Sequence, residues 1–231
     1  GGGGAAAATI ISSTTTASDG YVIEEGALKM ACLYQTFRTM NFNQSGSANS
    51  GRFTSITKVI DDMAKRTPIT KDSVFIDMGS GAGLVCFYVA LKYGCKCIGV
   101  EVSVPVNAIA EGFLMALPEL ENLLTFKECD FTQLGAKWYD DNAISHLYAF
   151  DGVYAERIRL PMIEQIMKCN CDITGAFTRR HYLSWPAEIK ESAEKSVSVQ
   201  LVGSTSSFQF YTWTKRGHRA RQAPKRLVEE I

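Results

Sequence analysis

The sequence has no excess of charge of either sign and no apolar run long enough to cross a membrane. Its 24 Lys and Arg balance its 24 Asp and Glu, so no overall field draws it toward nucleic acid or a membrane surface. Charged residues or glycines interrupt every apolar stretch before the roughly 20 residues that a spanning helix needs. We therefore expect no membrane partner and an intracellular location, in the nucleus or the cytoplasm.

A disulfide framework is also missing. The seven cysteines are odd in number and spread along the chain, which is typical of a reducing compartment. Two Cys-x-Cys pairs, Cys95/Cys97 and Cys169/Cys171, raise the alternative of a metal site. Their spacing is tighter than that of usual zinc ligands, and they border expected strands where cysteine packs as a small apolar residue. We expect no metal.

The length of 231 residues suits one folded domain with shorter flanking segments. Apolar residues at helical spacing predict a helix over Val22–Met40 and a second from Thr54 to just before Pro68, separated by a loop at 41–52 rich in Gly, Asn and Ser. The opening Gly, Ala and Thr runs lack the features of a secretory signal. We divide the chain into a low-complexity disordered leader at 1–20, an N-terminal helical segment at 21–70, a core domain at 71–216 and a basic tail at 217–231.

From residue 74 onward, short apolar strands alternate with helices, which predicts a mostly parallel sheet covered on both faces. The expected strands are Val74–Met78, Cys97–Val102, Leu124–Glu128, Ser145–Phe150 and Ile173–Phe177. The expected helices are Leu84–Lys92, Val106–Leu117 and Pro161–Lys168. Two last strands, 197–202 and 208–214, are joined too closely for a parallel crossover and must form an antiparallel hairpin. The fold class is α/β, and it resembles the Rossmann-like seven-stranded sheet of class I methyltransferases.

A glycine-rich loop follows the first of these strands and opens a helix. Gly79, Gly81 and Gly83 permit a tight turn and close approach of a ligand, to which the helix presents unpaired N–H groups. Their G-x-G-x-G spacing differs from the G-x-G-x-x-G of dinucleotide sites. Asp77 at the loop entrance suits the cationic sulfonium and ammonium of S-adenosylmethionine better than a diphosphate. We expect the loop, including Ser80, to bind this cofactor.

Acidic residues also end the next two strands. Glu101 is placed to accept hydrogen bonds from ribose hydroxyls, and Asp130 with Phe131 offers an acceptor and a ring to the adenine. Cofactors bind outside the carboxyl ends of strands in such sheets, where all these residues fall. The alternatives are that Asp77 or Asp130 caps a turn and that Glu101 is a solvated strand end.

Over residues 50–216 the sequence resembles the non-SET histone-lysine methyltransferases named for disruption of telomeric silencing. The segments that carry the resemblance are Gly51–Thr54, Ile60–Met63, Val74–Val85, Gly94–Lys96, Gly99–Glu101, Cys129–Phe131, Gly203–Ser204 and Tyr211–Trp213. The resemblance implies S-adenosylmethionine as methyl donor, Thr54 as a further cofactor contact, and a protein lysine on the nucleosome surface as acceptor.

The resemblance weakens on the acceptor side. Where the family has paired asparagines and aromatics after the fourth strand, this chain has Phe150–Tyr154, and Ser50 and Arg52 replace an upstream tyrosine and glutamate. We select Asp151 and Tyr154 as candidate catalytic residues, because a carboxylate orients an ammonium and an aromatic ring favours a cation or a lysine stem. The alternative is that Tyr154 packs and Asp151 begins a turn.

The run Lys215–Arg226 contains basic residues without an acid and can contact DNA phosphates, although a solvated basic end is the alternative. Methylation of RNA or a small molecule is a second enzyme hypothesis. The chain lacks the Asn- or Asp-Pro-Pro-aromatic motif typical of base amino-group methylation. A non-catalytic module that only binds the cofactor is the third hypothesis, and the sequence does not determine the oligomeric state.

Overall fold

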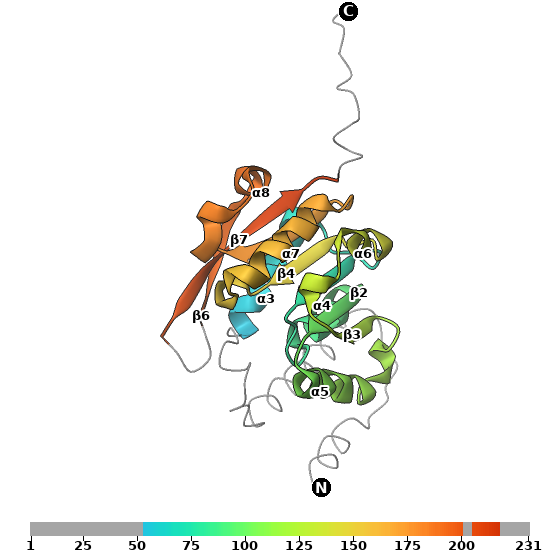
Figure 1. Ribbon diagram of the computed structural model, residues 1–231. Coiled ribbons are helices and arrows are strands. Elements are labelled where there is room, and N and C mark those ends of the chain that lie inside the picture. The colour runs from blue at the N-terminus through green and yellow to red at the C-terminus, as the bar shows by residue number, and fades with distance from the viewer. Residues whose placement is uncertain (1–52, 201–204, 218–231) are drawn as a thin grey trace, which may run out of the picture.

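The described part of a computed structural model, residues 53–200 and 205–217, forms one mixed sheet with helices on both faces (Figure 1). The leader, the expected helix at Val22–Met40 and most of the basic tail lie outside the described residues. The strands are β1 (Val74–Met78), β2 (Lys96–Glu101), β3 (Leu124–Glu128), β4 (His146–Ala149), β5 (Ile173–Thr178), β6 (Glu194–Gln200) and β7 (Ser207–Lys215).

Their order across the sheet is β3-β2-β1-β4-β5-β7-β6. Strands β1 to β5 are parallel, and β7 runs antiparallel to both β5 and β6. The predicted α/β class, with seven strands and a C-terminal antiparallel hairpin, is therefore confirmed.

Helices cover both faces of this sheet. They are α3 (Phe53–Arg66), α4 (Leu84–Tyr93), α5 (Val104–Met115), α6 (Ala136–Asp141), α7 (Glu156–Lys168) and α8 (Ala187–Ser192). Short 3-10 turns follow four elements, namely η2 (Pro118–Leu120), η3 (Phe131–Gln133), η4 (Asp151–Val153) and η5 (Arg179–Ser184). No described helix has both the length and the apolar character that a bilayer crossing requires.

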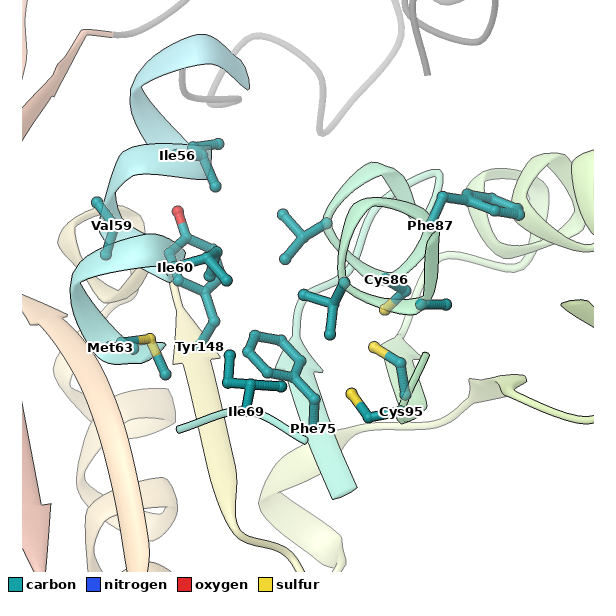
Figure 2. Close-up of a cluster of buried hydrophobic side chains, with 14 of the residues drawn as sticks. Ile56, Val59, Ile60, Met63, Ile69, Phe75, Cys86, Phe87, Cys95 and Tyr148 are labelled. Carbon is teal, nitrogen blue, oxygen red and sulfur yellow. The ribbon is translucent and has the colours of Figure 1, made fainter. Parts of the chain in front are cut away.

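The alternation of side chains along each strand divides the core into two clusters. Phe75 faces the cluster under α3 and α4, whereas Ile76 faces the cluster under α7. Figure 2 shows Ile60 and Met63 of α3 on the same side of the sheet as Phe75. Both faces of β1 are therefore covered by helices. Its carboxyl end is the part where a site can form.

Three helical features differ from the predictions. Helix α7 begins at Glu156 instead of Pro161, which lies inside the helix. A proline was expected only in the first turn, but the buried Met162 and Ile166 hold the longer helix against the sheet. The short helices α6 and α8 were not predicted, because segments of this length depend on tertiary packing more than on their own sequence.

Lys215 is a correction to the predicted basic run. It is the last residue of β7, and only 1% of it is exposed. Its ammonium donates hydrogen bonds to the carbonyls of Cys169 at 2.5 Å and Cys171 at 3.0 Å. This contact satisfies carbonyls at the end of α7, where a cation is also favoured by the helix dipole. Lys215 therefore belongs to the core and is not available to DNA.

Candidate cofactor and acceptor site

The site residues predicted on β1 and β2 lie together because these strands are parallel neighbours. Asp77 is paired with Gly99 of β2 on one side and with Tyr148 of β4 on the other. The carboxyl ends of the three strands therefore open onto one edge of the sheet, which is where ligands bind in such folds. Asp77 and Glu101 converge there.

The glycine loop folds over the end of β2. The N–H groups of Gly79 and Ser80 both donate to the carbonyl of Val100, at 2.8 and 3.0 Å. Gly79, Gly81 and Gly83 have φ values of 72°, 55° and 83°, a left-handed conformation that favours glycine. The expected tight turn is thus formed by all three glycines.

The surroundings of the three glycines nevertheless differ. A methyl group added at Gly81 would have no atom within 4 Å, so this position is open to a ligand. One added at Gly83 would lie 2.5 Å from the Phe126 ring, so this glycine allows α4 to pack closely on β3. One added at Gly79 would collide with the hydroxyl of Tyr154. Ligand access therefore concentrates at Gly81.

Asp77 is a buried carboxyl, with 3% of the residue exposed. No hydrogen bond to it comes from any residue that the structure describes. Burial, together with the negative charge of Glu101, raises its pKa to about 8. A buried acid that is not compensated by the protein is a frequent mark of a binding or catalytic site. A cation bound beside it would restore its ionised form.

Glu101 connects β2 to the glycine loop. Its Oε2 accepts a hydrogen bond from the N–H of Gly81 at 3.0 Å, and its Oε1 accepts one from the N–H of Ser103 at 2.9 Å. These bonds fix the carboxylate beside the open position of the loop. Each oxygen keeps a second lone pair, so ribose hydroxyls can still be accepted.

Asp130, the third predicted acidic residue, also has a structural role. The Asp130 carboxylate accepts hydrogen bonds from the N–H and hydroxyl of Thr132, at 2.9 and 2.7 Å, and so caps η3. Phe131 is buried, and its ring centroid lies 5.4 Å from that of Tyr154. The cofactor roles of Asp130 and Phe131 stay predictions. Thr54 is the second residue of α3, and its side chain lies outside what the structure describes.

The structure changes the expected role of Ser80 and adds Val102 to the site. The Ser80 hydroxyl is buried under the loop and faces Gly99, so only its backbone takes part in the turn. Val102 follows Glu101 directly and is 69% exposed. An exposed apolar side chain at the mouth of a site offers a surface to a flat ring. Sequence reasoning missed it, although its position after the strand-ending acid could have indicated it.

Tyr154 extends from the segment after β4 to the glycine loop. Its hydroxyl donates to the carbonyl of Met78 at 2.5 Å and contacts Gly79. The ring thus lies between the loop and Phe131. This places one of the two predicted acceptor residues directly beside the predicted cofactor site.

Asp151 lies behind this segment and is fully buried. Its Oδ1 accepts a hydrogen bond from the N–H of Thr178 at 2.6 Å, while its Oδ2 has no partner among the described residues. Its pKa is raised to about 7, because the effect of burial exceeds the opposing effects of hydrogen bonding to Thr178 and of the charge of Arg159. In this arrangement Asp151 contacts the protein instead of the open edge, and its catalytic role stays a prediction.

A cavity of about 580 Å³ lies beside this segment. Residues of α7 and η5 line it: Glu156, Arg159, Arg179, Arg180, His181, Leu183 and Ser184. Arg180 donates to the carbonyl of Gly152 at 2.6 Å, which links the cavity wall to η4. Sequence reasoning missed this cluster, because its two halves come from different elements.

The described cysteines are free thiols, and burial raises the pKa of Cys95 to about 11. Within residues 53–200 and 205–217, no group of three or more His, Cys, Asp or Glu side chains is arranged to hold a metal ion.

Comparison with known proteins extends this description. Residues 54–150, from α3 to the end of β4, match the family model of the histone methylation protein DOT1. A protein of Pyrococcus horikoshii, provisionally described as an RNA methyltransferase, shares the fold with a TM-score of 0.54 and 12% identity, over 82% of this chain and 98% of that one. Magnesium protoporphyrin IX methyltransferase of Synechocystis, solved with S-adenosylmethionine bound, gives 0.51 and 12%, over 87% and 100%.

At such identities the structural likeness concerns the fold, and the family match concerns the segment that forms the glycine loop. That segment contains Asp77, Glu101 and Asp130, whereas the cavity residues of η5 follow it. The chain therefore has the fold of class I S-adenosylmethionine-dependent methyltransferases, and its segment 54–150 is similar to the histone methylation protein DOT1.

Proposed function

We propose that the protein transfers a methyl group from S-adenosylmethionine to a lysine side chain of a protein substrate, with a nucleosomal histone as the substrate. The observation that carries the proposal is that Glu101 binds the N–H of the open glycine Gly81 and lies near enough to the buried Asp77 to act on it electrostatically, in a segment that matches DOT1. The basic tail, as a contact for DNA, is part of the same proposal.

The methyl donor, S-adenosylmethionine, would be held by residues at the carboxyl ends of the strands and in the glycine loop. Asp77 would bind the cationic part of the cofactor, and Glu101 would accept hydrogen bonds from the ribose hydroxyls. Asp130, Phe131 and the exposed Val102 would contact the adenine. The carboxylate of Glu101 is the best oriented of these groups, because two backbone N–H groups already hold it.

S-adenosylmethionine supplies an electrophilic methyl group on a sulfonium that departs as a neutral thioether. The protein must therefore bring a neutral amine into line with that methyl group and exclude water. Tyr154 is the side chain placed for this, since its ring borders the glycine loop and its hydroxyl is fixed by Met78. Asp151 supports this arrangement indirectly, because its hydrogen bond with Thr178 holds η4 in position.

A second candidate function is methylation of RNA or of a small acidic molecule. The arginine-rich cavity beside η4 favours it, because guanidinium groups attract phosphate or carboxylate and repel a lysine ammonium. A chain that only binds the cofactor is the third candidate. These three functions differ in what receives the label from a radioactive donor.

The test uses tritiated S-adenosylmethionine with nucleosomes, free histones and RNA, together with calorimetric titration of S-adenosylhomocysteine. Label on histone lysine is the expected result, and label on RNA alone would replace the first proposal by the second. Asp77→Ala and Glu101→Ala should each weaken binding at least tenfold. Asp72→Ala, which removes an exposed aspartate outside the site, is the matched control. Binding without any transfer would favour the non-catalytic module.

A further inference from the structure

We propose that the cavity between α7 and η5 is a subsite for a phosphate group carried by the methyl acceptor. The inference rests on the proposed methyl transfer, and it concerns an acceptor that itself carries phosphate, as in the second candidate function. It concerns residues that no predicted site included, and its evidence is the state of Arg159.

Arg159 is a buried cation whose hydrogen bonds are incomplete. Only 2% of the residue is exposed, yet its Nε and Nη1 have no partner among the described residues. A guanidinium is always charged, and its five N–H donors cost several kcal/mol to remove from water unless acceptors replace the water. Asp151 lies near enough to interact electrostatically with it, but accepts no hydrogen bond from it. Arg159 is one of the residues that line the cavity, so its charge acts on a ligand bound there.

The other charges of the cavity add to the same potential. Arg179 and Arg180 line it from η5, and the opposing charge comes from Glu156 on α7. Burial lowers the pKa of His181, and the charges of Arg159 and Arg180 act in the same direction. Three guanidinium groups against one lining carboxylate leave an excess of positive charge.

This excess favours phosphate over other anions. A carboxylate has one charge and two oxygens, which a single guanidinium saturates, whereas a phosphate monoester presents three oxygens and up to two charges. The start of α7 also lies at the cavity, and a helix N-terminus contributes in the same direction. The cavity has the volume for a phosphate group and part of the molecule that carries it.

The cavity lies close to the place where we propose that the methyl acceptor binds. The segment from Asp151 to Tyr154 contacts both places: the Tyr154 hydroxyl lies against the glycine loop, and Arg180 of the cavity wall donates to the carbonyl of Gly152. An acceptor lying over this segment would reach both sites. Its phosphate in the cavity would then orient the nitrogen that faces the methyl donor.

The first experiment titrates the full chain with inorganic phosphate at constant ionic strength, by calorimetry. Saturable binding is expected, and Arg159→Met should weaken it about tenfold or more. Arg157→Ala is the matched control, since Arg157 is an exposed arginine of the same helix outside the cavity. Arg179→Ala removes an exposed lining cation with little risk to folding, and should weaken phosphate binding severalfold.

Competition then identifies the source of the phosphate. Uridine monophosphate tests a phosphate monoester, and an oligouridylate without terminal phosphate tests a nucleic-acid backbone. Competition by either supports the subsite and names its class of acceptor. Absence of phosphate binding to the wild-type chain, or binding that neither Arg159→Met nor Arg179→Ala weakens, would overturn it. Binding of S-adenosylhomocysteine is measured in parallel, so that failure of the methyl-transfer proposal is seen separately.

Discussion

Asp77 should make the stability of the cofactor-free protein depend on pH. Its pKa is raised from 3.8 to about 8, mainly by burial and also by the charge of Glu101. Between these two values the folded protein keeps a proton that the unfolded chain has lost. Raising the pH therefore favours unfolding, by up to about 1.4 kcal/mol for each pH unit.

The full effect is reached above pH 8, where Asp77 is ionised in both states. A pKa change from 3.8 to about 8 then corresponds to roughly 5 kcal/mol of lost stability. This is a large part of the roughly 5–15 kcal/mol that stabilises a typical domain. Asp77→Asn removes the titrating group and keeps the shape. The variant should match the wild type near pH 4 and exceed its stability by several kcal/mol at pH 9.

Urea unfolding of both proteins without cofactor, at intervals from pH 4 to pH 9, measures this difference. Taking the difference cancels the other titrating groups. Glu101→Gln serves as a second variant, since loss of its negative charge should lower the Asp77 pKa and flatten the pH dependence, while the amide oxygen can still accept from Gly81. A difference between wild type and Asp77→Asn that stays constant over this range would refute the argument.

Three further substitutions test the packing around the site. Gly175→Ala would drive a methyl group into the buried ring of Trp213 and should lower the unfolding free energy by about 3 kcal/mol, measured by urea unfolding. Asp61→Ala removes the acceptor that joins α3 to Tyr88 of α4, and thermal unfolding should show a loss of about 1–2 kcal/mol. Lys215→Met leaves two buried carbonyls without their donor and should cost about 1–3 kcal/mol by the same assay. Unchanged stability in any variant would contradict its stated contact.

The strand pattern and the glycine loop were readable from the sequence, because each is encoded within a few consecutive residues. The apolar run of β1 is buried in any sheet that has helices on both faces, and its boundaries are confirmed. The G-x-G-x-G spacing required left-handed turns, which all three glycines adopt. The parallel order then placed Asp77 and Glu101 at one edge without further information.

Short helices and proline positions were less predictable. Helix α6 has only six residues, and the buried Tyr139 anchors it to the core. Helix α7 begins at Glu156 and continues past Pro161, because residues on both sides of the proline are buried in the core. In each case the energy that decides the structure comes from contacts with distant segments. Local propensity alone gave the wrong boundary or no helix.

The acceptor side depended almost wholly on the tertiary structure. The sequence supplied Asp151 and Tyr154 as neighbours in one segment, but the fold buries the first against Thr178 and turns the second to Gly79. It also brings Arg159 of α7 together with the arginines of η5. The sequence by itself thus determined the sheet and the glycine loop, whose signals are periodic and local. Only the tertiary structure decided which charged side chains are buried, open or paired, because that depends on residues brought together from separate elements.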